Sequence, residues 1–239
     1  AAPRLTLDAE GAARAPYFAA LVEYESGNLR AALPLFRKSA RLSAALGLRG
    51  DEETALSMEA DVLAQLGRWS EAVARLDEAR AALPDDADGC LRAASIVNRG
   101  FILLRVPPAS RHDAAGHLLD PLAPLTATVE LYRGACRDPD PEDMANALTN
   151  LALVEIDRGR PAAARAYLDE AAAASPRMSA RLRTSWLAFR GRAALGEGHA
   201  EEALHVFDDL AALGKAARVQ EARLEAALGR AQALEALRR

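Results

Sequence analysis

The sequence has few of the residues from which strands, disulfide scaffolds and membrane spans are built. Isoleucine and valine together number only 12 of 239 residues, and a sheet would need many more of these β-branched side chains. Two cysteines are too few for a disulfide scaffold. No apolar run approaches the length of about 18 residues that a membrane-spanning helix requires. All-β, α/β and membrane-spanning proteins are therefore disfavoured.

Lysine is also scarce, and the charge is nearly balanced. Lys38 and Lys215 stand beside 28 arginines, and the net charge of −4 provides no basic field for nucleic acid. The chain starts Ala1-Ala2-Pro3-Arg4, which is neither an initiator methionine nor a signal peptide. We therefore expect a cytoplasmic piece of a longer protein, without a nucleic-acid or membrane partner.

Alanine and leucine are abundant instead. The chain holds 57 alanines and 36 leucines, the residues with the highest helix propensity. With 27% charged and 51% hydrophobic residues it is not disordered. The composition predicts an all-α fold.

The same spacing follows four glycines along the chain. A small residue comes five positions after each glycine, and further core-type residues follow after four and three more. The four sets are Gly67, Ala72, Leu76 and Ala79; Gly159, Ala164, Leu168 and Ala171; Gly198, Ala203, Phe207 and Leu210; and Gly27, Ala32, Phe36 and Ser39. Such recurrence predicts repeated structural units.

A second pattern precedes the glycines and places residues on one helical face. In the second repeat its members are Leu56, Ala60, Leu63 and Gly67, with steps of four, three and four. The glycine would end this first helix in the left-handed conformation, and a second, antiparallel helix would follow after a short turn.

This unit resembles the tetratricopeptide repeat in its small mid-helix residues Ala60 and Ala72, its turn glycine Gly67 and its closing Pro84. The resemblance extends over about residues 13–213. The turn glycines lie farther apart than the family's usual period, and in this they resemble the long repeats of bacterial regulatory and signalling proteins. The resemblance implies a stack of helix pairs that recognises proteins through its shape.

We therefore predict an α-solenoid of about five antiparallel helix pairs plus a C-terminal capping helix. The expected division is a leader at 1–11, unit 1 at 12–46, unit 2 at 51–84, an irregular unit 3 at 88–137, unit 4 at 141–176, unit 5 at 178–213 and the capping helix at 215–239.

The third unit is irregular. Pro107 replaces the turn glycine and is followed by a longer, proline-rich loop, and Pro121 and Pro124 interrupt the following segment. We expect one kinked helix, or two short coaxial ones, from about 111 to 136. Cys90 opens this unit and Cys136 closes it, so a disulfide is geometrically conceivable. Free thiols in a reducing cytosol are the favoured alternative.

The last segment carries a helical stripe of apolar residues and ends the array. The stripe consists of Ala217, Leu224, Ala227, Leu228, Ala231 and Leu234. Since a solenoid needs a terminal helix with a polar outer face, we expect this stripe to cover the last repeat. The alternative is the first helix of a further repeat.

No motif of catalysis is present. The sequence contains no phosphate-binding loop, dinucleotide fingerprint or nucleophile elbow. The histidines lack the spacing of metal ligands. We expect no enzyme activity, no cofactor and no metal site. An unrecognised site around His112 and His117 is the enzymatic alternative.

The helix-pair alignment places a set of first-helix residues on the concave face. They are Tyr17, Tyr24, Met58, Asp61, Asn98, Phe101, Asn150, Asp157, Phe189 and Arg192. Asn98 and Asn150 are equivalent in the repeat. By resemblance such an asparagine grips the backbone of an extended peptide, which an amide can do as both donor and acceptor. Alternatively, the two asparagines bridge neighbouring helices.

A basic segment lies in the fifth unit around Trp186. Its arginines Arg177, Arg181, Arg183 and Arg190 are joined by no acidic residue. They form either an acidic-peptide site with an aromatic floor or a solvated face paired with acids of neighbouring helices.

These observations favour a non-catalytic scaffold that binds a protein or peptide in its concave groove. We expect it to be the regulatory or sensor part of a larger bacterial signalling protein, linked to a protease, an ATPase or a transcription regulator. The partner could be a domain of the same polypeptide. The alternative is a self-assembly module that uses the solenoid ends or the convex face.

Overall fold

The computed structural model describes residues 2–84, 86–113, 115–217 and 219–238. These residues form helices and no strand. The α-helices are α1 (Ala2–Glu25), α2 (Leu29–Ala45), α3 (Arg49–Gln65), α4 (Trp69–Ala82), α5 (Gly89–Arg105), α6 (Leu122–Gly134), α7 (Pro141–Asp157), α8 (Pro161–Ala174), α9 (Ala180–Gly196), α10 (Ala200–Ala216) and α11 (Gln220–Ala236). The expected all-α fold is confirmed.

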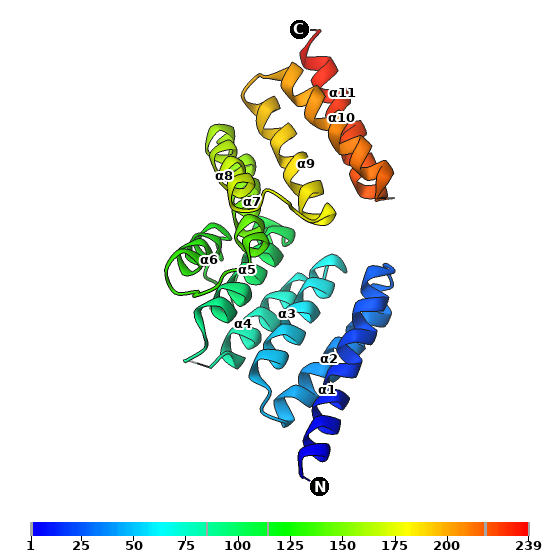
Figure 1. Ribbon diagram of the computed structural model, residues 1–239, viewed down its shortest axis with the longest axis vertical. Helices are drawn as coiled ribbons and strands as arrows, with labels where there is room; N and C mark the ends of the chain where they lie inside the picture. The colour runs from blue at the N-terminus through cyan, green and yellow to red at the C-terminus, as the bar shows by residue number, and fades with distance from the viewer. Residues whose placement is uncertain (1, 85, 114, 218, 239) are drawn as a thin grey trace. The chain divides into compact units, whose positions relative to one another are not determined.

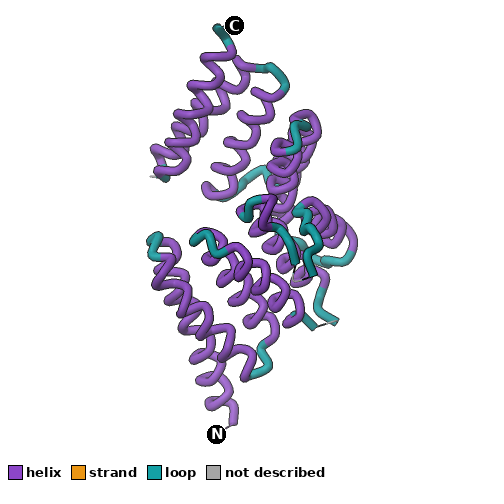
Figure 2. The backbone as a smooth tube through the Cα atoms, turned by 180° about the vertical axis from the view of Figure 1, so that it is seen from behind, coloured by secondary structure: helices purple, strands orange, loops and turns teal. Residues whose placement is uncertain are grey.

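The chain divides into two compact units, Ala1–Arg137 and Asp138–Arg239. Within each unit consecutive helices run antiparallel and pack pairwise (Figures 1 and 2). The first helices of successive pairs also touch, α3 against α5 in the first unit and α7 against α9 in the second. Each unit is therefore a short α-solenoid of stacked helix pairs.

The turn glycines end the first helices as the repeat pattern predicts. Gly67 has a φ of 74°, its N–H bonds to Ala64 O at 3.0 Å, and the N–H of Arg68 bonds to Leu63 O at 2.9 Å. This pair of bonds is a Schellman cap, which requires the left-handed conformation that glycine adopts at low cost. Gly27, Gly159 and Gly198 also have positive φ values.

The small residues of the repeat lie where two helices approach. Ala60 of α3 and Ala72 of α4 are completely buried, and Leu63 and Leu76 fill the space beside them. Burying such a leucine contributes about 1.5–3 kcal/mol, so these positions supply much of the driving force for pairing.

The third helix pair differs from the expected kinked helix. Helix α6 begins only at Leu122. Before it, the chain turns back on itself, with the N–H of Leu119 bonding to Arg111 O at 2.7 Å and the N–H of Asp113 to His117 O at 3.0 Å. Pro121 is the N-cap of α6 and Pro124 lies in its first turn. Neither proline has to supply a helical N–H there, so the helix starts at the prolines and is not kinked by them.

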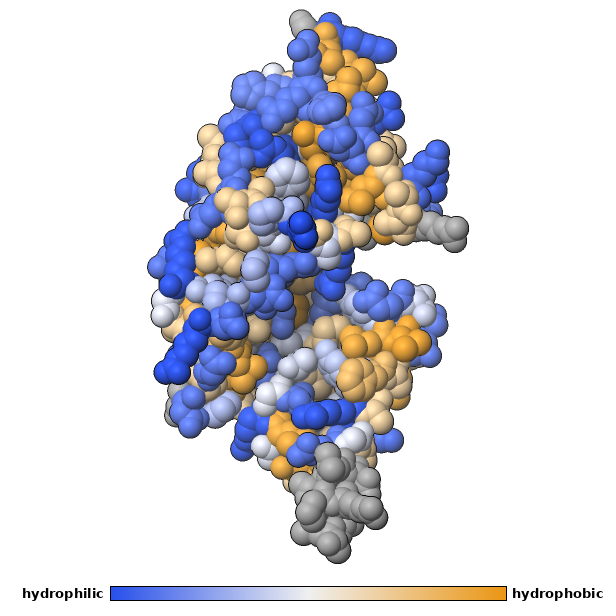
Figure 3. Space-filling model, viewed as in Figure 1, coloured by the Kyte–Doolittle hydropathy of each residue, from blue (hydrophilic) through white to orange (hydrophobic). Residues whose placement is uncertain are grey.

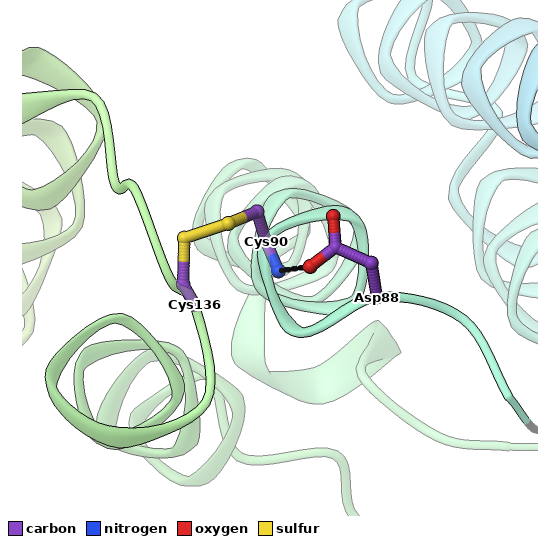
Figure 4. Close-up of a disulfide and its surroundings, with 3 residues drawn as sticks. All are labelled: Asp88, Cys90 and Cys136. Atoms are coloured by element: carbon purple, nitrogen blue, oxygen red, sulfur yellow. Dashed lines mark hydrogen bonds between the residues drawn. A yellow bond between two sulfur atoms is a disulfide. The ribbon is translucent and has the colours of Figure 1, made fainter.

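Cys90 and Cys136 form a disulfide, and the expectation of free thiols is wrong for this structure (Figure 4). Their Cα atoms lie 4.5 Å apart, with Cys90 at the start of α5 and Cys136 just after α6. The neighbouring Gly89 explains the approach, because a Cβ at this position would lie within 3.0 Å of the backbone of Ala135. The two helix ends therefore meet at a distance that suits a disulfide.

The last helix packs by a different face from the one expected. Ala222, Ala226 and Ala233 of α11 are buried, whereas Leu224 and Leu228 are 64% and 58% exposed. The reason is Gly229, where an added Cβ would lie within 3.0 Å of the Phe207 ring of α10. Because the close approach of Phe207 requires small residues, α11 turns its alanines inward and its leucines outward. Lys215 and Ala216 belong to α10.

Candidate binding face of the first helices

Three first helices of the first unit bring a polar cluster together. Asp61 of α3 accepts hydrogen bonds at Oδ2 from the Tyr24 hydroxyl of α1 at 2.6 Å and from Gln65 Nε2 at 2.7 Å. Its Oδ1 lies 3.2 Å from Nε of Arg105, which projects from α5. Phe101 lies under the guanidinium of Arg105, 4.7 Å from its ring centroid. We call these five residues the Asp61 cluster.

Asp61 is buried at the centre of this cluster. The residue is only 4% exposed, and a buried carboxylate is stabilised only by charge pairing and hydrogen bonds. Burial, followed by the nearby Asp61 carboxylate, raises the pKa of Tyr24 to about 12. The phenol therefore stays protonated near neutral pH and continues to donate to Asp61.

The outer part of the cluster is accessible to a ligand. The Arg105 side chain is 39% exposed, and Gln65 is exposed beside it. The contact of Arg105 with Asp61 is an ion pair through Nε, so the terminal nitrogens of Arg105 remain able to donate to a carboxylate or a carbonyl oxygen. The cluster presents a cation on an aromatic ring, an arrangement suited to binding rather than to proton transfer.

Other expected residues of the first unit lie outside this cluster. Tyr17 packs edge-on against Phe36, with 5.5 Å between ring centroids, and Met58 packs partly buried against the same core. Both contribute to helix packing. Asn98 is exposed on α5 and forms no hydrogen bond to another described residue.

In the second unit the equivalent Asn150 has a different environment. It is 5% exposed, and its Nδ2 has no hydrogen-bond partner among the described residues. On the same pair of first helices, Arg192 of α9 lies 3.3 Å from Asp157 of α7 and stacks over Phe189 at 5.9 Å. The second unit thus repeats the combination of an acid, an arginine and an aromatic ring.

The arginines of the basic segment differ in their surroundings: one forms an ion pair and three are exposed to solvent. Arg190 is bound to Asp169 at 2.5 Å and lies over Trp186 at 5.3 Å. Arg177, Arg181 and Arg183 are exposed. The interpretation as an acidic-peptide site stays a prediction.

Sequence reasoning missed Arg105. The signal was present, because Arg105 follows Phe101 by one helical turn and so shares its face. What the sequence could not show was that the carboxylate of Asp61, from another helix, holds this arginine.

A search of the described residues finds no group of three histidine, cysteine, aspartate or glutamate side chains placed to hold a metal ion. His117 is bound through Nδ1 to Asp113 at 3.0 Å within the turn that precedes α6. Over the same described ranges, no helix combines the length and apolar character needed to cross a bilayer.

Comparison with known proteins identifies a solved structure with a similar fold. A solved structure from work on the functional characterization of Pseudomonas aeruginosa PilF superposes with a TM-score of 0.57 at 18% sequence identity. The match covers 92% of this chain and 91% of that one. The fold is tetratricopeptide-like. No protein-family model matches the sequence, and no curated protein does.

Proposed function

We propose that this tetratricopeptide-like solenoid is a non-catalytic scaffold that binds a peptide segment of a protein partner on its first-helix face. The observation that carries the proposal is the Asp61 cluster, where three first helices hold Arg105 over Phe101 at an accessible surface. A fold of stacked helix pairs supplies such a face as a continuous wall.

The chemistry of the cluster selects the kind of segment. Arg105 offers donors to an acidic side chain, and Phe101 and Leu21 offer apolar surface nearby on α5 and α1. The buried Asp61 fixes the guanidinium before a ligand arrives, which lowers the entropy cost of binding. An extended segment that carries an acidic residue next to an apolar one fits these features.

The test is a selection of peptides followed by titration. A random peptide library displayed on phage is selected against the immobilised full chain, and the recovered peptides are titrated by fluorescence anisotropy. Arg105→Gln should weaken binding at least about tenfold, because a hydrogen bond to a charged group contributes about 1.5–3 kcal/mol. Arg92→Gln is the matched control, since Arg92 is exposed on the same helix without an acidic partner among the described residues.

The control separates this proposal from a general charge effect. Equal affinities of Arg105→Gln and Arg92→Gln for the selected peptides would contradict binding at the Asp61 cluster. Failure of the library to yield any peptide that saturates the chain would also count against it.

The proposal also covers the biological role of the scaffold and its cellular compartment. By resemblance, we propose a regulatory role within a larger bacterial signalling protein. For the compartment, the Cys90–Cys136 disulfide favours an oxidising environment over the cytoplasmic location that the sequence suggested. Alkylation of the natively produced protein without reductant, read by mass spectrometry, should leave both cysteines unmodified; adducts on both would return the proposal to a reducing compartment.

Self-assembly is the second candidate function, and the outer face of α11 favours it. Leu224, Leu228 and Leu234 are 64%, 58% and 44% exposed along this helix, and Figure 3 shows apolar side chains over it. The proposed occupant is the same face of a second copy. Light scattering should show a mass that rises with concentration and falls to the monomer in Leu228→Glu. The control Ala166→Glu, on an exposed position of α8 in the same unit, should leave the mass unchanged. A monomeric mass at all concentrations would exclude this candidate.

A further inference from the structure

A second recess lies in the first unit, away from the Asp61 cluster, between the second helices α2 and α4. Its volume is about 760 Å³, within the range of small-molecule sites. The two helices form its walls, and Leu56 and Glu59 of α3 contribute to its lining. We call it the α2–α4 cleft.

A buried carboxylate organises this cleft. Glu59 is 1% exposed, and its Oε1 lies 2.7 Å from Nε of Arg37 on α2 and 3.4 Å from Nε of Arg75 on α4. The carboxylate is thereby neutralised from both walls, as a buried charge requires. Both arginine side chains line the cleft and remain about a third exposed, at 34% and 35%.

Four arginines and four glutamates line the cleft, so an anion can bind only where an arginine is not already used by a glutamate. The rim acids are each held by an arginine: Glu71 by Arg68 at 2.6 Å, Glu52 by Arg49 at 3.1 Å, and Glu78 by Arg75. Arg41 is exposed in the cleft and has no acidic partner among the described residues.

Arg41 and Arg37 lie one turn apart on the same wall. Because positions four residues apart share a helix face, their guanidinium groups can reach one ligand. The α2 wall therefore carries surplus hydrogen-bond donors and positive charge.

We propose that the α2–α4 cleft binds a small organic anion through Arg37 and Arg41, with Glu59 positioning Arg37. Guanidinium forks match the oxygens of carboxylate and phosphate groups, which are the shared chemistry of the ligand. The volume exceeds that of a bare anion, and Ala40, Ala44 and Leu56 offer apolar surface to the organic part. The cleft shares no residue with the Asp61 cluster, so this proposal can be tested independently of the proposed function.

The experiment titrates the full chain with three probes: citrate, inorganic phosphate and tetraglutamate. Amide chemical shifts of α2 and α4 report binding. We expect saturable shifts with at least one probe; citrate or tetraglutamate identifies a carboxylate ligand, free or peptide-borne, and phosphate alone identifies a phosphate ligand. Arg41→Gln should weaken the affinity at least about tenfold. Arg30→Gln, on an exposed position of the same helix outside the cleft, should leave it unchanged.

A second variant tests the cleft without removing charge. Ala44 is exposed in the cleft about one turn after Arg41, and Ala44→Phe should place a ring beside that arginine and weaken the affinity for the probe while the fold is retained. The proposal is overturned if none of the three probes saturates. It is overturned equally if Arg41→Gln and Arg30→Gln bind the effective probe with the same affinity.

Discussion

Glu53 is a buried carboxylate of α3 that no arginine or lysine neutralises within the described residues. It is 2% exposed and accepts a hydrogen bond from the Ser57 hydroxyl at 2.8 Å. Burial raises the pKa of Glu53, and the hydrogen bonds from Ser95, Ser57 and Thr54 offset this only in part. Ionised Glu53 therefore costs stability.

The consequence is a pH-dependent effect of Glu53→Gln. A carboxyl whose pKa is raised by folding binds more protons in the native state, so stability falls as pH rises above its unfolded value of about 4.3. We expect the variant to be more stable than the wild type at pH 7. The difference should shrink toward pH 4, as measured by urea denaturation across this range. A constant difference at all pH values would contradict the assignment.

Gly229 illustrates a position where space, not backbone conformation, demands glycine. The Phe207 ring is fully buried, and a Cβ at either Gly229 or Gly191 would lie within 3.0 Å of it. The ring therefore lies close to the backbone of both α9 and α11 and leaves no room for a side chain at either glycine.

We expect Gly229→Ala to destabilise the second unit by about 1–3 kcal/mol through overpacking. Gly134→Ala is the control, because nothing lies within 4 Å of its added Cβ and the position is the last residue of α6. Thermal unfolding followed by circular dichroism should show a lower midpoint for Gly229→Ala and a midpoint near the wild-type value for Gly134→Ala. A midpoint of Gly229→Ala at or above the wild-type value would contradict the packing argument.

At the scale of elements, the pair α5 and α6 combines a long irregular connection with a disulfide between the two helix ends. Helix α5 ends at Arg105 and α6 begins at Leu122, so the connection is long, and the disulfide closes a loop with a sequence separation of 46 residues. In the chain-entropy account a crosslink of this span contributes about 4 kcal/mol at most.

We therefore expect the double variant Cys90→Ser with Cys136→Ser to lose about 2–4 kcal/mol of stability, mainly in the first unit. Denaturant unfolding of the wild type with reductant should approach the same value, which controls for the substituted side chains. If reductant leaves the wild-type midpoint unchanged, the disulfide makes no contribution to stability.

Some elements could be predicted from sequence patterns alone, and the helix pair around Gly67 is one of them. The residue spacing around Gly67 reflects contacts within one helix pair. The observed Schellman cap and the burial of Ala60 follow from this spacing. The stripe of Leu224 and Leu228 was interpreted wrongly. Two faces of α11 are apolar, and only the shape of Phe207 on α10 decides which one is buried.

At the scale of the whole molecule, stacked pairs make stability a nearest-neighbour property. Phe207 contacts residues of both α9 and α11, and repeats of this kind transmit destabilisation mainly to adjacent pairs. A defect in the second unit should therefore remain local.

We expect Phe207→Ala, which removes about 3–5 kcal/mol of core packing, to accelerate amide hydrogen exchange in α9, α10 and α11. Exchange in α1 to α4 should stay at its wild-type rate. Faster exchange throughout the chain would show that the two units unfold together.

The composition and the repeat determined by themselves that this chain folds into antiparallel helix pairs, because propensity, glycine caps and small mid-helix residues act over a few neighbouring positions. They also placed Tyr24, Asp61 and Phe101 on one face. The tertiary structure alone decided the Arg105–Asp61 pairing, the Cys90–Cys136 bond and the outward leucines of α11. Each of these depends on the distance between helices that are remote in sequence, and packing sets that distance.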